Sequence, residues 1–277
     1  MRLGEGLGEG GLFTPASIVA MVFVAAVVVV ARRGRSLSLP GAGAALLVGA
    51  SASFAGWRFA LLLLVFFVTA TRLSRLGREA KRQLTGAIVE KGDERDAWQV
   101  LANGGVFAAA ALVSFLWPSH SAAAMAASGG ALAAACADTW STEIGTLSLS
   151  PPRSIVTGRV VPPGTSGGVS KLGYAGMIAG AVVIGLTSRI LGWSGTIAVA
   201  AVFGGIVGAL ADSFIGALWQ SRRRCPKCEA FTERAVHDCG TGTVAAGGLP
   251  WLDNDGVNAL CTMAGALAAL GAWAALR

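Results

Sequence analysis

The feature that most constrains this chain is a series of apolar runs, each close to the length of a membrane span, separated by short charged loops. A helix needs about 20 residues to cross the hydrocarbon core of a bilayer. Eight segments approach this length: 12–31, 39–56, 57–74, 103–118, 121–138, 170–191, 195–218 and 257–276. The second and third are joined only by a short corner at Gly56, so seven spans are the alternative.

The composition agrees with a membrane protein. Only 13% of the 277 residues are charged, 54% are apolar and 39 are glycine, whereas a soluble domain carries about 25% charge. Spanning helices tolerate low charge and are enriched in glycine. We therefore expect an all-α, polytopic membrane protein that forms a single domain over residues 1–277.

The distribution of Lys and Arg predicts the topology. Eighteen of the 22 basic residues lie in alternate loops, within 32–35, 72–95, 153–171 and 222–234. The positive-inside rule places these loops in the cytoplasm and both termini outside. The net charge of +7 is thus explained by membrane topology, and no nucleic-acid partner is expected.

A weak repeat in the C-terminal half indicates functional carboxylates. Residues 130–144 align without gaps on 204–218, which sets Asp138 over Asp212 at predicted cytoplasmic ends of two spans. A carboxylate in a span is costly and usually functional, although solvation at a helix end is the alternative. Both units would run in the same direction, so the repeat is parallel. Glu143 joins the face of Asp138 only if the helix breaks within 139–142.

The loop that follows Asp138 ends in a glycine turn, defined here as residues 164–168, just before Ser170. Glycines and free N–H groups at the start of a helix can form an anion site, although the turn is also typical of a linker. Phosphate-binding candidates in and around this loop are Arg153, Arg159, Gly167, Gly168, Ser170 and Lys171.

Two further polar groups flank the predicted spans. Gln99 and Asn103 are one helical turn apart where the chain enters the membrane, and they could contact a lipid headgroup or cap helices. Asp253 and Asn254 precede the last span, and Asn258 lies at its start. The three could add metal or phosphate ligands, with Asp253 as the metal candidate, or the segment could form an ordinary turn.

The segment 225–239 has the pattern of a small zinc-knuckle-like cytoplasmic loop. Cys225 and Cys228 form a C-x-x-C pair, and His237 and Cys239 complete a candidate tetrahedral set for structural zinc. Redox or free thiols are the alternative.

Carboxylates beside an anion site favour one chemistry. Carboxylates hold Mg²⁺, the metal bridges nucleotide phosphates, and cations balance the charge on the transferred group. Asp138, Asp212 and Asp253 are the Mg²⁺ candidates, and Asp138, Glu143, Asp212 and Lys171 the catalytic ones. The acceptor would come from the bilayer.

Five motifs in order resemble one family: ERDAWQVLANGG (94–105), ADTWSTEIG (137–145), VPPGTSGGVS (161–170), ADSFIGALWQ (211–220) and WLDNDGVN (251–258). They are similar to the integral-membrane family of plant and cyanobacterial phytyl-phosphate kinase and animal transmembrane protein 19, from about residue 60 to the C-terminus. The resemblance implies phosphorylation of an isoprenoid monophosphate by a nucleoside triphosphate. The motifs also look distantly like those of polyprenol kinases and CDP-lipid synthases, which use CTP.

By position, the resemblance marks two groups of site residues: Asp138, Glu143, Asp212, Asn254 and Asn258 as acidic and amide positions, and Gly167, Gly168 and Ser170 as the glycine turn. We therefore expect a Mg²⁺-dependent prenyl-phosphate kinase whose site opens on the cytoplasmic face. A cytidylyltransferase that makes a CDP-lipid is the alternative enzyme. A secondary transporter is the alternative outside enzymes, because internal repeats and carboxylates within spans are common in transporters.

Overall fold

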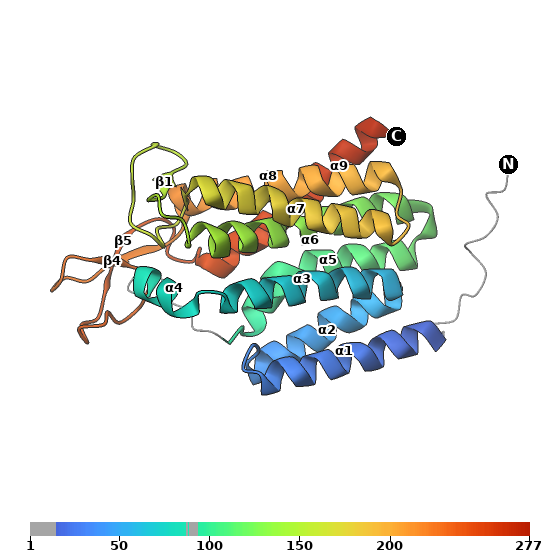
Figure 1. Ribbon diagram of the computed structural model, residues 1–277, viewed down its shortest axis with the longest axis horizontal. Coiled ribbons are helices and arrows are strands. Elements are labelled where there is room, and N and C mark those ends of the chain that lie inside the picture. Colours follow the sequence, from blue (N-terminus) through green and yellow to red (C-terminus); the bar gives the residue numbers. More distant parts are fainter. Residues whose placement is uncertain (1–14, 87, 89–93) are drawn as a thin grey trace.

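The computed structural model describes residues 15–86, 88 and 94–277. Within them, eight helices of 17 to 25 residues run along a common direction (Figure 1): α1 (Pro15–Arg33), α2 (Leu39–Ala55), α3 (Trp57–Arg75), α5 (Ala97–Leu116), α6 (Ser121–Gly145), α7 (Lys171–Ile190), α8 (Gly195–Trp219) and α9 (Asn254–Leu276). Residues 12–14 of the predicted first span lie outside the described residues, as does Lys91 of the basic loop 72–95.

Five helices in the described part of the chain are long and apolar enough to cross a membrane: α3, α5, α7, α8 and α9. The helix α2 is apolar but has only 17 residues. The predicted helical membrane fold is therefore confirmed in outline, and eight spans stay a prediction. The corner between α2 and α3 is sharp because Gly56 has φ +132°, a conformation that glycine adopts readily.

The helix α6 lies at the centre of the bundle and packs against α5, α7, α8 and α9. Its residues 128–137 are all buried, and seven of these ten are alanine or glycine. Small residues let neighbouring helices approach closely. A Cβ on Gly180 of α7 would lie only 2.8 Å from the carbonyl oxygen of Cys136. This close packing fixes the position of Asp138, two residues further along α6.

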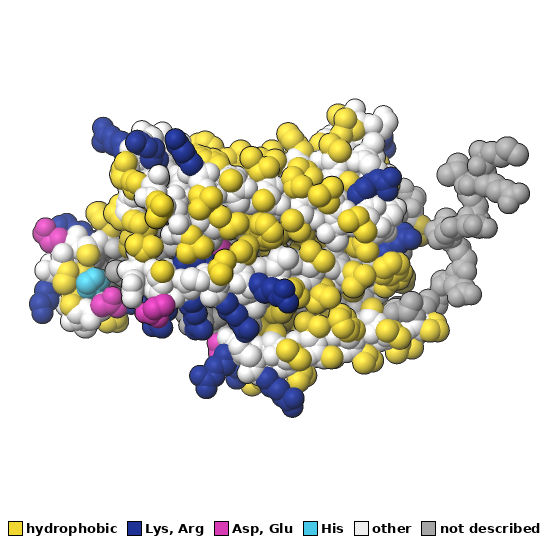
Figure 2. All heavy atoms as spheres, viewed as in Figure 1, with side chains coloured by type: hydrophobic (Ala, Val, Ile, Leu, Met, Phe, Trp, Pro, Cys, Tyr) yellow, Lys and Arg dark blue, Asp and Glu magenta, His cyan; other side chains and the backbone are white. Residues whose placement is uncertain are grey.

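Short elements gather at one end of the bundle (Figure 1). They are α4 (Arg78–Thr85), the antiparallel pair β1 (Arg153–Ser154) and β2 (Gly168–Val169), and a three-stranded antiparallel sheet in the order β4 (Phe231–Thr232), β3 (Arg222–Arg224), β5 (Val244–Gly247). We call residues 222–247 the β lobe. The 3₁₀ turn η1 (Pro118–His120) links α5 to α6. Figure 2 shows many Lys and Arg side chains at the end that carries the β lobe.

Candidate functional site: a polar cavity over two aspartates

A cavity of about 970 Å³ opens at the end of the bundle that carries the β lobe. Its walls come from the ends of α3, α6 and α8, the starts of α5 and α9, the helix α4, the glycine turn and the β lobe. We call it the polar cavity. Most of the site residues expected from the sequence line it: Asn103, Asp138, Glu143, Gly167, Gly168, Ser170, Asp212, Asp253, Asn254 and Asn258.

Asp138 and Asp212 meet inside this cavity. The helices α6 and α8 both have 25 residues, and each aspartate lies seven residues before the last residue of its helix. Both carboxyl groups line the cavity, and they are close enough to interact with each other electrostatically. The oxygen Oδ1 of Asp212 is buried and has no hydrogen-bond partner in the described part of the chain. The alignment that paired the two residues in sequence thus pairs two side chains in space.

Glu143 reaches the cavity without a helix break. The helix α6 continues unbroken to Gly145, so the break within 139–142 that we gave as the condition for this placement does not occur. Glu143 lines the cavity from the last turn of α6, and its Oε2 lies 2.6 Å from Nζ of Lys81 on α4. Lys81 also donates a hydrogen bond of 2.7 Å to the carbonyl oxygen of Leu73. Sequence reasoning missed Lys81 because 62 residues separate it from Glu143.

The glycine turn packs tightly against α8. Gly167 has φ +73°, and a Cβ there would lie 2.4 Å from Cβ of Ala217. Ser170 is the N-cap of α7: its Oγ accepts a hydrogen bond of 3.1 Å from Gly173 N and donates one of 3.0 Å to Gly145 O. The turn therefore reaches the cavity as expected, while the capping serine satisfies one N–H of α7.

The amide and acidic residues near α5 and α9 also line the cavity. Asn103 donates a hydrogen bond of 2.9 Å to the carbonyl oxygen of Gln99, which leaves its amide oxygen available to a ligand. Asp253 is the N-cap of α9, and its Oδ1 accepts a hydrogen bond of 2.9 Å from Gly256 N. Asp253 therefore has a structural role beside the metal role predicted for it.

Three predicted phosphate ligands are placed elsewhere. Arg153, Arg159 and Lys171 are exposed and do not line the polar cavity. Lys171 follows the buried Ser170, and the helical rotation of one residue turns it outward. The placement therefore does not support a phosphate-binding role for these three side chains. The cations that do line the cavity are Arg35, Arg75, Arg78, Lys81, Arg82, Arg95, Arg223 and Arg234.

An apolar groove of about 110 Å³ adjoins the polar cavity. It lies between α1, α2, α3 and α5, and its apolar walls include Val27, Ala45 and Phe67. Four residues line both spaces: Arg95, Gln99, Asn103 and Thr139. The predicted membrane-entry position of Gln99 and Asn103 was a signal for this junction. Arg95 lies in the first of the five motifs, but it was not among the predicted site residues.

The four predicted zinc ligands come together in the β lobe. One ligand atom from each of Cys225, Cys228, His237 and Cys239 lies within 4.8 Å of the others. Hydrogen bonds with Thr241 and His237 lower the pKa of the Cys239 thiol to about 5, which favours the thiolate, the form that binds metal. The cluster is separate from the residues that line the polar cavity.

A bundle of apolar helices around a polar cavity places the chain among integral membrane proteins. The model of the family called integral membrane protein DUF92 matches residues 22–266, and the chain belongs to this family. Protein PGR of Arabidopsis thaliana is 33% identical over 248 residues, which cover 81% of this chain and 84% of that protein. These findings confirm the family that the five motifs predicted.

A second relative comes from an archaeon. An uncharacterized membrane protein of Methanocaldococcus jannaschii is 37% identical over 174 residues, which cover 61% of this chain and 68% of that protein. No solved structure gives a significant match to the chain.

Proposed function

We propose that this protein is a membrane kinase that transfers a phosphoryl group from a nucleoside triphosphate, CTP in our proposal, to an isoprenoid monophosphate. The product would be the diphosphate of an alcohol such as phytol or geranylgeraniol. One observation carries the proposal: a polar cavity with two paired aspartates meets an apolar groove through four shared residues. That combination suits an acceptor with a charged head and an apolar chain.

The paired aspartates fit a divalent cation. Asp212 Oδ1 is a buried acceptor without a partner in the described part of the chain, and two adjacent buried carboxylates are costly unless a cation compensates them. Mg²⁺ prefers one or two carboxylates together with substrate phosphates. Asp138 and Asp212 would hold the ion, which when bound neutralises charge on the nucleotide phosphates.

The other residues of the site would bind and orient the two substrates. Arg75, Arg82 and Arg223 line the cavity and supply positive charge for the phosphates of the nucleotide. An acceptor monophosphate is already ionised near pH 7, so its attacking oxygen needs no general base. Catalysis then comes from holding the two phosphates close together and from balancing the charge on the transferred group.

The acceptor would bind at the residues that line both spaces. Arg95 lines both spaces, and its guanidinium can pair with the acceptor phosphate at the junction. The amide of Asn103 adds a neutral donor or acceptor beside it. The isoprenoid chain would then lie along Val27, Ala45 and Phe67 in the groove, which removes it from water.

The site would face the cytoplasm. The loops rich in Lys and Arg lie at the same end of the bundle as the polar cavity, and the positive-inside rule assigns such loops to the cytoplasmic side. Nucleotides are available on that side of the membrane.

Labelled CTP separates this function from its alternatives. Purified protein in detergent is incubated with phytyl or geranylgeranyl phosphate, Mg²⁺ and CTP labelled at the α or the γ phosphate. A kinase transfers γ label to the lipid, whereas a cytidylyltransferase transfers α label. Transfer of neither label across a panel of prenyl monophosphates and four nucleotides contradicts an enzyme of either kind and favours a transporter.

A further inference from the structure

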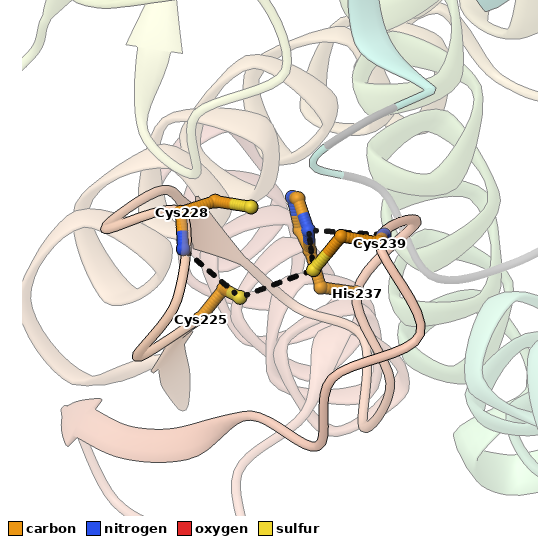
Figure 3. A group of neighbouring side chains, drawn as sticks. All are labelled: Cys225, Cys228, His237 and Cys239. Atoms are coloured by element: carbon orange, nitrogen blue, oxygen red, sulfur yellow. Dashed lines mark hydrogen bonds between the residues drawn. The ribbon is translucent and has the colours of Figure 1, made fainter.

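Two tight turns in the β lobe carry four metal-binding side chains (Figure 3). The first turn follows β3 and is closed by a hydrogen bond of 2.9 Å from Glu229 N to Cys225 O. The second is closed by a hydrogen bond of 3.0 Å from His237 N to Thr241 O. Figure 3 shows the side chains of Cys225, Cys228, His237 and Cys239 pointing toward one another across the gap between the turns.

The spacing of these side chains fits a tetrahedral ion. Sγ of Cys225 lies 3.6 Å from Sγ of Cys239, and Nδ1 of His237 lies 3.2 Å from the same Cys239 sulfur. A zinc ion with bonds of about 2.3 Å to sulfur keeps its ligand atoms roughly 3.8 Å apart. The backbone N–H of Cys228 also donates to Sγ of Cys225 at 3.4 Å, an outer contact that stabilises a thiolate ligand.

The β lobe has almost no apolar core of its own. Within residues 222–247, all of which the structure describes, the buried side chains are those of Cys225, Thr232 and Thr243. A segment this small cannot bury enough apolar area to stay folded and needs a disulfide or a metal instead. The four cysteine and histidine side chains supply such a cross-link between the two turns.

The β lobe in turn supports the polar cavity. Glu233 follows β4, and its Oε1 accepts hydrogen bonds from Oγ of Ser166 at 2.9 Å and from Nε2 of Gln220 at 2.7 Å. Its backbone N–H donates to the carbonyl oxygen of Ile88 at 2.9 Å. Ser166 belongs to the glycine turn, so Glu233 connects the β lobe to a wall of the cavity.

We propose that the β lobe binds one Zn²⁺ through Cys225, Cys228, His237 and Cys239, and that this ion holds Glu233 against the glycine turn. The ion is structural, since all four positions of a tetrahedral site are filled by protein. Zinc removal would therefore loosen the β lobe first and the cavity wall as a consequence. The ion itself would take no part in the reaction proposed for the cavity.

Metal content and hydrogen exchange of the full-length protein in detergent test the proposal. We expect one zinc ion per chain in the wild type and in the control C136A, whose cysteine is buried in α6 away from the cluster. C228S should lose most of the zinc. Protein expressed with Co²⁺ should show the visible absorption of a tetrahedral cobalt thiolate site, and C228S should lack it.

Exchange within 222–247 and within the glycine turn should be faster in C228S by tenfold or more, while α6 and α8 stay protected. The variant E233A, which removes the acceptor oxygen, should keep its zinc and loosen only the glycine turn. Wild-type protein without zinc, a Cys225–Cys239 disulfide detected by mass spectrometry, or unchanged exchange in zinc-free C228S would each overturn the proposal. None of these measurements depends on kinase activity, so failure of the proposed function leaves this test intact.

Discussion

Lys81 and Glu143 form an ion pair of 2.6 Å that joins α4 to the last turn of α6 across one wall of the polar cavity. Their side chains are only 10% and 22% exposed. Because Lys81 also donates to the carbonyl oxygen of Leu73, one ammonium group connects α3, α4 and α6. The pair therefore sets how α4 lies over the cavity.

The variants K81M and E143Q should each destabilise the protein by roughly 1–3 kcal/mol, because each leaves a largely buried charged group without its partner. The double variant should lose less than the sum of the two, since it leaves no unpaired charge. Thermal unfolding in detergent measures the cycle. E79Q is the control, because Glu79 is an exposed residue of α4. Strictly additive losses of stability would show that the interaction between Lys81 and Glu143 contributes nothing to stability.

The variants D138N and D212N should abolish phosphoryl transfer while the protein stays folded. Each amide keeps the size of the carboxylate and removes a charge that is costly to bury. Mg²⁺ should raise the Tm of the wild type by binding the folded state, and this shift should vanish in both variants. More than about a tenth of wild-type turnover at saturating Mg²⁺ would remove that residue from the metal site.

Lys171 and Lys81 show how far the sequence predicts which side chains come together in space. Asp138 and Asp212 were found because each is a rare charge in an apolar run, and the four zinc candidates because they lie within 15 residues of chain. Lys171 was chosen for its nearness to the glycine turn, but the rotation of α7 turns it outward. Lys81 and Arg95 reach the cavity through tertiary packing, which local spacing does not encode.

Lys171, at the exposed start of α7, and Arg82, in the cavity wall, test which cations bind the phosphates. K171M should leave kcat and KM unchanged, because this side chain does not line the cavity. R82M removes a cation that does line it, so KM for the nucleotide should rise several-fold with a smaller effect on kcat. Steady-state kinetics at varied CTP decides between them. A large loss of kcat in K171M would contradict this expectation and show that Lys171 takes part in catalysis.

Two glycines with similar backbone angles differ in their surroundings. Gly167 has φ +73° and would place a Cβ 2.4 Å from Ala217, whereas Gly158 has φ +68° and open space around it. G158A should cost only the backbone strain, roughly 1–2 kcal/mol. G167A adds a steric clash, so its Tm should fall further and activity should fall with it. Equal losses in the two variants would mean that the glycine turn is not packed against α8.

Filling the apolar groove should select against long acceptors. Ala45 lines the groove on α2, and A45F would occupy the space proposed for the isoprenoid chain. KM for geranylgeranyl phosphate should rise tenfold or more, while a short prenyl phosphate, whose chain does not reach Ala45, should be affected little. L47F is the control, because Leu47 is an exposed residue on the same helix. Equal effects of A45F on short and long acceptors would mean that the isoprenoid chain lies outside the groove. The acceptor phosphate would still be free to reach Arg95 in that case.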